Sequence, residues 1–582
     1  MNFRHLILGF AASLVFVAGA VAQDQEEAPA LPDIAPRTVE IRGQLEINFP
    51  ALERQPLVGF NPPPRIIDLT NRLPYMEPYR ISAAELPASP LQPPERLHIG
   101  QSGIPRRTGQ IEARAGSYLL RHVDARLEHT IQPELAVSGR LVYRGHDGHQ
   151  PFDFEPDAHS STDYIEGGAD FRFQARGLRG GVGMEGLHSA YDLFGAAGTR
   201  QTQSMRDWPL RKGQQLRATT WLHTNEDAPI VGSAQLTLDG ASYDTNICRD
   251  NAANCSDDDF SRNLRTFGAS GSVEVPFNLT SILADAEFMM SGQDRAAVAG
   301  TDIMTVDAGL GGRIVTRNGV TVSAIARILH ENASTPEVDR STIYVSPEVR
   351  IDVFPVTGVQ IFAENKPSVS HPSLAEIHRE NPYIVAQPLL RPEVRTVDAR
   401  AGVRLYQGPA TIDVGVGYMQ APVYRYFEYA PRYPYAEGFS SVNYGEANIL
   451  TVGGEASFAF RDRMTATLGL EWRNGRLSED DGDVDIPNVS PITGRAMFAV
   501  PLLDNRITLS ATGRYESARY RDRLETRELG DYFAVDVSGV YRINPVIGIV
   551  LAVENISGGH LERWDRYPQP PTLISGGMRI SW

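Results

Sequence analysis

The chain of 582 residues is poor in several features that usually mark a fold or a function. It has two cysteines, Cys248 and Cys255, and only two lysines, Lys212 and Lys366. Beyond the first residues, no apolar run reaches the roughly 18 residues that a membrane-spanning helix needs. Helical periodicity is also nearly absent. These absences exclude a helical membrane protein and leave strands as the main element to be expected.

The N-terminus has the pattern of a secretory signal peptide. Arg4 and His5 form a basic start, residues 6–18 are apolar, and Ala20-Val21-Ala22 supplies the small residues of a cleavage site. We therefore predict a signal peptide over residues 1–22; the alternative is a retained anchor helix. In an exported chain, the closely spaced Cys248 and Cys255 favour a disulfide over a metal site.

The net charge of −16 argues against nucleic acid as a partner. Because nearly all basic residues are arginine, bidentate contacts with lipopolysaccharide phosphates are one interpretation of the composition. A composition bias of the genome is the other. No Ser/His/Asp or Cys/His arrangement can be assembled, and the glycines of residues 181–186 lie within a predicted strand rather than before a helix. We therefore predict no enzyme, no catalytic residue, no cofactor and no metal site.

Apolar residues recur at every second position in many segments, which predicts strands with two different faces. In residues 464–472 the apolar face ends in Trp472, and the opposite face is small or polar. In the final segment Ile574, Met578, Ile580 and Trp582 oppose Ser575, Arg579 and Ser581. A soluble sandwich shows the same alternation, so the connections between strands must decide between the two folds.

Counting such segments gives about 22 strands between residue 109 and the C-terminus. The strands are expected near 109–118, 120–131, 133–146, 162–176, 178–190, 213–224, 229–244, 260–276, 280–293, 303–316 and 319–331. The others are expected near 341–353, 356–366, 393–407, 409–420, 446–460, 463–475, 489–501, 505–518, 530–542, 545–556 and 571–582. Tight turns, such as Pro355-Val356, alternate with long polar connections, notably 191–212, 367–392 and 421–445.

Alternating short and long connections are typical of outer-membrane barrels, whose short turns face the periplasm. A closed barrel also satisfies every backbone group in lipid. The predicted fold is therefore all-β: a transmembrane, antiparallel, up-and-down barrel over residues 108–582, integral to the cell outer membrane. An even strand number places both termini in the periplasm. Outer-membrane lipid and lipopolysaccharide are the expected surroundings.

Three groups of residues resemble the barrel domain of TonB-dependent receptors. The first is Gly116-Ser117-Tyr118 with Tyr143-Arg144-Gly145-His146-Asp147-Gly148, and the second is Asn381-Pro382-Tyr383 with Arg391-Pro392-Glu393. The third runs from Val553-Glu554-Asn555 through Trp564-Asp565-Arg566-Tyr567-Pro568 to Trp582. The resemblance implies uptake of a scarce nutrient, an unknown small molecule, driven by a TonB-type energy transducer. It also implies that the C-terminal aromatic residue, Trp582, is recognised by the barrel-assembly machinery.

The N-terminal part departs from that family, whose barrel is preceded by a globular plug. Residues 23–107 contain 15 prolines, which central strands and helix interiors exclude. We expect a proline-rich periplasmic or lumenal extension and no complete plug. The lumen of such a wide barrel must then be filled by this extension, by inward-folded loops or by a separate plug or cap protein. The strand-prone residues 37–41 are either a transducer contact or an ordinary extended stretch.

One candidate site stands out, a predicted loop that is dense in aromatic residues: Tyr424, Tyr426, Phe427, Tyr429, Tyr433 and Tyr435. Aromatic side chains can stack on a ligand or partner, whereas the alternative is an aromatic girdle with loop packing. His371 and His378, with Glu376 and Glu380, are more simply explained as exposed polar residues than as a metal site. The leading function is receptor-type transport. The alternatives are a porin-like passive channel and a surface-binding or structural barrel.

Overall fold

The computed structural model describes residues 107–149, 151, 160–175, 177–195, 209–225, 228–246, 261–293, 301–316, 319–334, 339–386, 388–430, 438–460, 464–480, 482–558 and 562–582. The predicted signal peptide and nearly all of the proline-rich extension lie outside the described residues. So do Cys248, Cys255, Tyr433 and Tyr435.

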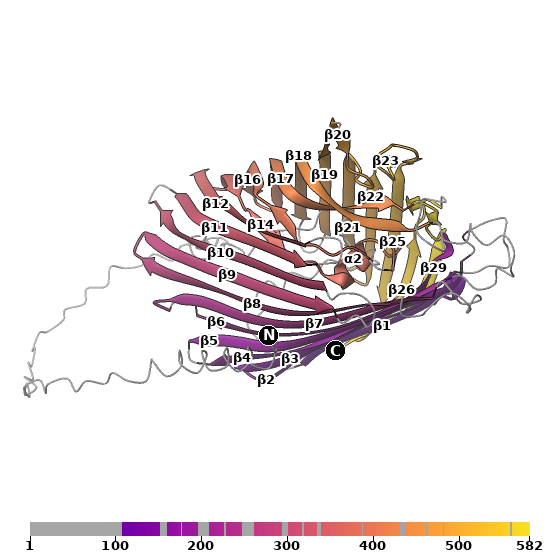
Figure 1. The fold of residues 1–582 in the computed structure, drawn as a ribbon. Helices are drawn as coiled ribbons and strands as arrows, with labels where there is room; N and C mark the ends of the chain where they lie inside the picture. The colour runs from indigo at the N-terminus through magenta and orange to yellow at the C-terminus, as the bar shows by residue number, and fades with distance from the viewer. Residues whose placement is uncertain are drawn as a thin grey trace, which may run out of the picture. The chain divides into compact units, whose positions relative to one another are not determined.

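A wall of 22 antiparallel strands forms a closed barrel (Figure 1). Its first strands are β1 (Arg107–Gly116), β2 (Arg121–Gln132), β3 (Leu135–His149), β4 (Ser160–Ala175), β5 (Leu178–Asp192), β6 (Leu210–Thr224), β7 (Val231–Asn246) and β8 (Ser261–Phe277). They are followed by β9 (Thr280–Gln293), β10 (Thr301–Val315), β11 (Val320–Ser334), β12 (Asp339–Val356), β13 (Val359–Asn365), β16 (Val397–Gln407) and β17 (Ala410–Tyr429). The last are β18 (Ser440–Phe460), β19 (Met464–Glu479), β21 (Ile492–Leu502), β22 (Ile507–Glu516), β25 (Tyr532–Arg542), β26 (Ile547–Glu554) and β29 (Leu573–Ser581).

The barrel closes where the first strand meets the last. β1 pairs with β29 in antiparallel register from Gln110 opposite Ser581 to Gly116 opposite Ser575. Trp582 continues this pairing, because its backbone exchanges two hydrogen bonds of 3.0 Å with Gly109. A wall closed in this way has no unpaired strand edge. The predicted barrel and its strand number are confirmed.

Short elements occupy the connections between the wall strands. They are η1 (Ser117–Leu119), β14 (Ser368–Ser370), α2 (Leu374–Glu380), β15 (Glu393–Arg395), β20 (Gly482–Asp485), β23 (Arg519–Tyr520), β24 (Glu528–Leu529), β27 (Glu562–Trp564) and β28 (Tyr567–Pro568). No helix among the described residues is long and apolar enough to cross a membrane.

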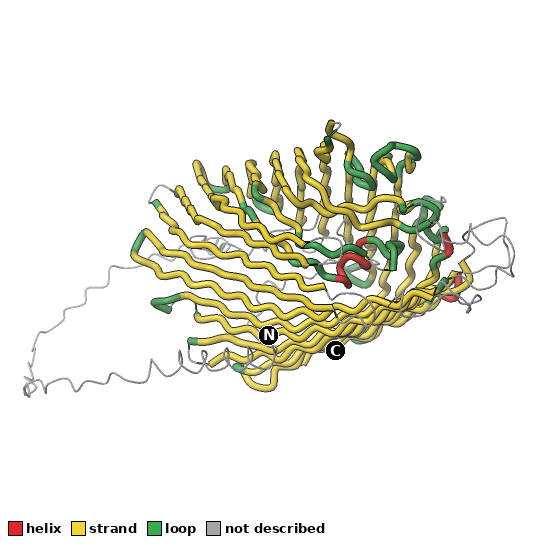
Figure 2. Tube along the Cα trace, in the orientation of Figure 1, coloured by secondary structure: helices red, strands yellow, loops and turns green. Residues whose placement is uncertain are grey.

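Tight turns lie at one end of the barrel, and the described parts of the long connections gather at the other (Figure 2). At the tight end, Gly177 and Gly408 adopt φ values of 75° and 57°, which glycine reaches without steric cost. The turn predicted at Pro355-Val356 lies at Thr357-Gly358 instead, because β12 runs on through Pro355. A register shift between Val353 and Val356 accommodates this proline, which has no N–H to give to the ladder.

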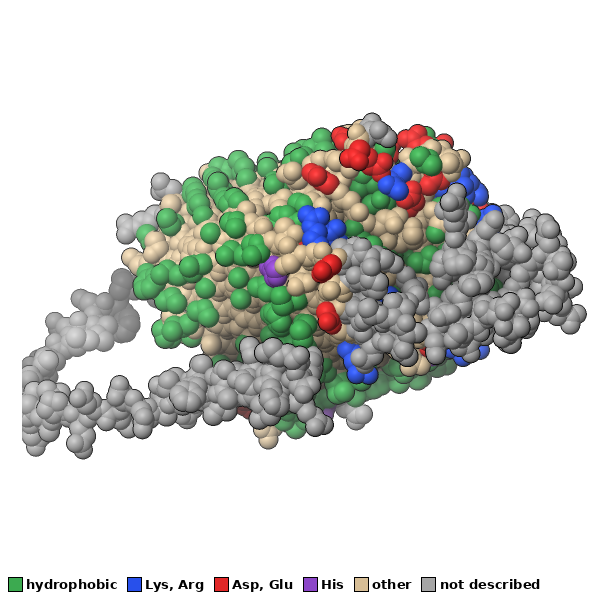
Figure 3. Space-filling view, in the orientation of Figure 1, with side chains coloured by type: hydrophobic (Ala, Val, Ile, Leu, Met, Phe, Trp, Pro, Cys, Tyr) green, Lys and Arg blue, Asp and Glu red, His purple; other side chains and the backbone are tan. Residues whose placement is uncertain are grey.

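The two faces of the wall differ as the alternation predicts. Val414, Val416 and Tyr418 of β17 are exposed on the outer face, and Asp413 of the same strand makes ion pairs on the inner face. Hydrophobic side chains spread over the outer wall in Figure 3, whereas acidic side chains gather over the ends of β20 and β23. An apolar outer face and a polar inner face are the pattern of a barrel in lipid.

Candidate functional site

The connection between β13 and β16 lies inside the barrel. We call residues 366–396 the inner segment; it holds β14, α2 and β15. Ser373 begins α2 by accepting a hydrogen bond from the backbone N–H of Glu376 at 3.4 Å, as an N-cap residue does. Asn381-Pro382 ends the helix, since a residue before proline avoids the helical conformation. Asn381 Oδ1 then accepts the N–H of Tyr383 at 2.9 Å.

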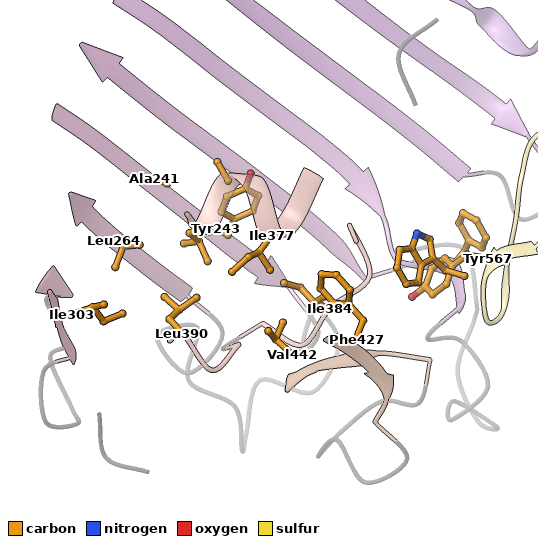
Figure 4. Close-up of a cluster of buried hydrophobic side chains, with 14 residues drawn as sticks. Ala241, Tyr243, Leu264, Ile303, Ile377, Ile384, Leu390, Phe427, Val442 and Tyr567 are labelled. Atoms are coloured by element: carbon orange, nitrogen blue, oxygen red, sulfur yellow. The ribbon is translucent and has the colours of Figure 1, made fainter. Parts of the chain in front are cut away.

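Apolar contacts join the inner segment to distant parts of the wall (Figure 4). Ile377 and Leu390 of the segment belong to one buried cluster with Tyr243 of β7, Ile303 of β10 and Phe427 of β17. In β7, exposed Leu238 lies on the opposite face from Tyr243, so Tyr243 points into the lumen. The inner segment therefore bridges strands that lie far apart around the barrel.

Polar contacts attach the same segment at several further points. Arg391 forms two bonds of 2.9 and 3.3 Å with Glu331 of β11, a side chain that is 1% exposed. Arg425 of β17 pairs with Glu380 at 2.7 Å. The carbonyl oxygen of Pro382 accepts from Arg211 of β6 at 2.8 Å and from the hydroxyl of Tyr191 in β5 at 3.0 Å. Pro382 and Arg391, which belong to the second group of residues that resembles TonB-dependent receptors, thus attach the inner segment to the wall.

The two histidines of the inner segment have separate partners. His371 hydrogen-bonds to Ser291 of β9 and, at 3.1 Å, to Thr305 of β10, and burial lowers its pKa to about 4. His378 stacks on Tyr243 with ring centroids 3.7 Å apart, and burial lowers its pKa well below the ordinary value. The expected exposed position is therefore wrong for His378, which is buried, and Glu380 pairs with Arg425. Among the described residues there is no group of three or more ligands that could hold a metal ion.

The connection between β26 and β29 contributes a second covering element. Its β27–β28 hairpin places Tyr567 against Tyr383 of the inner segment, with stacked rings whose centroids are 3.4 Å apart. Trp564 of the same hairpin contacts the ring of Phe427 edge-on at 5.7 Å. Arg519, in the neighbouring connection, donates to the carbonyl oxygen of Arg563 at 2.6 Å. The inner segment and this hairpin therefore form one packed layer.

A cavity of about 250 Å³ lies beside this layer and is rich in charge. Its arginines come from the inner segment, the wall and the covering connections: Arg395, Arg400, Arg425, Arg473, Arg519 and Arg563. Its carboxylates are Glu380, Glu393, Asp398 and Glu516, and its aromatic residues include Tyr424, Tyr426, Phe427 and Trp564. Guanidinium groups in a fixed position suit the oxygens of an anionic ligand, and the aromatic faces suit its flat or apolar parts.

Close ion pairs fix the orientation of most of these arginines. Arg473 pairs with Glu471 at 2.7 Å, and Arg400 pairs with Asp413 at 2.6 Å. Arg395 pairs with Glu393 at 2.7 Å. Their guanidinium groups are thus held in place before a ligand arrives, which lowers the entropic cost of binding.

The aromatic residues predicted to lie in a loop are placed differently by the structure. Tyr424, Tyr426, Phe427 and Tyr429 belong to β17, which runs on to residue 429, and the connection begins only at residue 430. Tyr424, Tyr426 and Phe427 line the cavity. The ring of Tyr429 lies 4.1 Å from the guanidinium carbon of Arg521. The loop assignment was wrong for these four residues. The C-terminal part of β17, residues 424–429, is buried on both faces, with Tyr426 against Leu477 and Phe427 against Trp564.

The sequence did not single out the arginine–carboxylate pairs of the inner wall. They include Arg217 with Asp239, Arg313 with Glu274, Arg327 with Asp307, Arg404 with Asp413, Arg495 with Glu455, and Arg579 with Glu112. Arginine at lumen-facing positions of the alternation is the signal that could have found them. Fixed charges on the lumen wall of a barrel tune the choice of solute.

Comparison with solved structures supports the barrel fold. No protein-family model matches the sequence, and no curated protein is similar to it in sequence. Among solved structures, the FrpB iron transporter from Neisseria meningitidis (F3-3 variant) superposes with a TM-score of 0.63 at 10% identity, over 82% of both chains. The siderophore receptor PiuA from Acinetobacter baumannii gives 0.60 at 10% identity, over 83% of this chain and 82% of that one.

The copper transporter OprC gives a TM-score of 0.58 at 12% identity, over 82% of this chain and 81% of its own. At such low identity the likeness concerns the fold alone. The closed wall of 22 strands, reached independently from the alternation and the connections, therefore has the barrel fold of TonB-dependent outer-membrane receptors, as the three groups of motif residues led us to expect.

Proposed function

We propose that this protein is an outer-membrane transport barrel that takes up a small solute carrying anionic oxygen groups. The observation that carries the proposal is the charged cavity beside the inner segment, where six arginines and several aromatic side chains line about 250 Å³. Guanidinium groups bind carboxylate, phenolate or phosphate oxygens through paired N–H bonds. The structures with the same barrel fold are named as iron, siderophore and copper proteins, which makes a metal chelate the first solute to test.

An uptake experiment with matched variants tests this proposal. Arg473→Gln removes one guanidinium from the cavity wall. Arg476→Gln, on the same strand, removes an arginine outside the cavity that pairs with Asp485 at the surface, both side chains being over 40% exposed. With radiolabelled ferric citrate and a ferric catecholate as probes, the first change should lower uptake about tenfold or more, as the loss of a charge-assisted contact does. The second should leave uptake unchanged. Equal uptake by both variants and the parent would refute the cavity as the solute site.

Uptake in cells that lack the energy transducer distinguishes energised transport from passive diffusion. We propose that a TonB-type transducer drives transport, so uptake should stop in cells that lack the transducer. A porin-like channel would continue to transport in those cells and would show large, steady openings in planar bilayers. A purely structural barrel would neither conduct nor bind the chelates.

We further infer that the inner segment narrows the lumen, since it bridges β7, β10 and β17. The proline-rich extension over residues 23–107 is a second candidate for filling the lumen, and it lies almost wholly outside the described residues. Deleting residues 24–105 distinguishes the two. Increased permeability to large antibiotics would assign the main barrier to the extension, and unchanged permeability would assign it to the inner segment or to a separate protein.

A further inference from the structure

Arg211 of β6 is a fully buried cation at the point where the inner segment meets the wall. Its exposure is 0%. Nε donates to the hydroxyl of Thr245 at 2.9 Å, and Nη1 donates to the carbonyl oxygen of Pro382 at 2.8 Å. Nη2 is buried and has no hydrogen-bond partner among the residues that the structure describes. Both of these acceptors are neutral, as is the hydroxyl of Tyr191, which also contacts Arg211, so none of them balances the charge.

No aspartate or glutamate among the described residues pairs with Arg211. Several other arginines with little exposure have a carboxylate partner: Arg114, which is buried, pairs with Glu112. Arg327 contacts Asp307 and Glu348, and Arg391 contacts Glu331. A guanidinium does not lose its proton in a protein, and an unpaired charge away from water costs several kcal/mol. Within the described part of the chain, Arg211 therefore lacks the counter-charge that Arg114 and Arg327 have.

The surroundings of Arg211 offer little compensation for the charge. The ring of Phe439 lies 5.8 Å from its guanidinium carbon, and Phe439 belongs to an apolar cluster with Leu193, Val385 and Ala386. Asn381, the neighbour of Pro382, is also fully buried, and its Nδ2 has no partner. The unpaired atom of Arg211 is an N–H donor, so the group that would complete its hydrogen bonding is an acceptor.

We propose that Arg211 binds a small monovalent anion, of halide or carboxylate chemistry, which completes the contact between β6 and the inner segment. The anion would accept from Nη2 and supply the missing negative charge. Full burial restricts the site to a small species and excludes bulk water as a source of screening. Because Arg211 does not line the charged cavity, this site is separate from the proposed solute site and does not rest on the proposed function.

Anion binding has a consequence for the inner segment. A ligand that binds only the attached form of the segment stabilises that form. The hydrogen bonds of Arg211 and Tyr191 to Pro382 would then hold the segment most firmly when the anion is present. Removing the anion would leave a buried, unpaired guanidinium and would favour detachment.

Anomalous diffraction from crystals of the full chain soaked in sodium bromide tests the site directly. A bromide peak within about 3.5 Å of Arg211 Nη2 would establish a halide. Density for formate there, in crystals soaked in sodium formate and lacking a bromide peak, would establish a carboxylate. If neither soak gives density at Nη2, or if only ordered water occupies it, the proposal is wrong.

A solution experiment with matched variants gives an independent answer. At constant ionic strength, replacing gluconate by chloride or formate should slow hydrogen exchange of the inner-segment amides around Pro382 about tenfold or more. Arg211→Met should abolish the difference, and Lys212→Met, which removes the neighbouring cation on the outer face, should preserve it. An anion effect of equal size in the parent and Arg211→Met would overturn the proposal. The crystals test the parent protein alone, so the proposal stays falsifiable even if Arg211→Met fails to fold.

Discussion

The seam between β1 and β29 should be intolerant of a single added methyl group at Gly577. An ideal Cβ at this position would lie 1.9 Å from the carbonyl oxygen of Ala113 and 2.7 Å from the Cα of Arg114. Both are backbone atoms of the neighbouring strand, so no side chain can rotate away to relieve the overlap. The alanine would also face Arg114, which is buried with Glu112 and close to Glu554.

The size of the effect follows from the overlap. Ordinary contact begins at 3.4 Å, so the strands must separate by about 3.4 − 1.9 = 1.5 Å. A ladder bond of about 2.9 Å would then lengthen to about 4.4 Å, beyond hydrogen-bonding distance. Losing two such bonds costs about 2 kcal/mol, and overpacking adds about 1–3 kcal/mol. Gly577→Ala should therefore lower the free energy of unfolding by about 3–5 kcal/mol.

Gly576 provides the matched control, because it precedes Gly577 in the same strand. A Cβ there would meet only the Cδ2 of Leu551 at 3.3 Å and a carbonyl oxygen at 3.8 Å, and a leucine side chain can adjust. Urea titration of detergent-folded protein, followed by tryptophan fluorescence and by the mobility of unheated samples on gels, compares the two variants. Equal unfolding midpoints for Gly577→Ala and Gly576→Ala would refute this account of the seam.

Three further predictions concern the inner segment and the C-terminus. Glu331→Gln should loosen the segment by about 3–5 kcal/mol, since it leaves Arg391 without its buried counter-charge; limited proteolysis should cut within residues 366–396 while the urea midpoint of the barrel stays unchanged. His371 has a pKa of about 4 when attached and about 6.5 when free, so the detached segment binds the extra proton between these values. Through His371, attachment should be strongest above pH 6.5 and weaken by up to about 300-fold as the pH falls to about 4, and the buried His378 of the same segment adds a change in the same direction; hydrogen exchange measures attachment, and a profile as steep in His371→Phe as in the parent would contradict the assignment. Deleting Trp582 removes both backbone bonds to Gly109 and should slow assembly into the outer membrane, as pulse-chase folding assays would show.

The strands of the wall were predictable because the surroundings of each strand determine which residue types occur along it. Lipid outside and charge inside impose a period of two on every strand, as in β29, where exposed Ile574 and Met578 alternate with Arg579. Strand number, antiparallel order and closure then follow from the connections. The boundary at Pro355 was missed because the proline lies in a bulge within β12 rather than in the turn.

The interior was less predictable, since it depends on contacts between residues far apart in the sequence. The hydrogen bond between Arg211 and Pro382 joins residues 171 positions apart, and no local sequence pattern predicts it. The upper part of β17 has aromatic residues on both faces because both faces are covered, so period-two alternation disappears there. The shift in register between Ala421 and Tyr424 disturbs the alternation further.

The contacts of the wall and those of the inner segment are of different kinds, so the stability of the barrel and the attachment of the inner segment should vary separately. The wall depends on continuous backbone ladders that are indifferent to most side chains. The inner segment depends on a few side-chain contacts, such as those of Arg391, Arg425 and His371, together with the apolar cluster around Ile377. Changes to these contacts should therefore alter how firmly the inner segment is attached while leaving the unfolding of the barrel unchanged, because a segment held by a few contacts can detach locally. Seam variants such as Gly577→Ala should do the opposite, and a variant of Glu331 that unfolded the whole wall would show that the two layers are one cooperative unit.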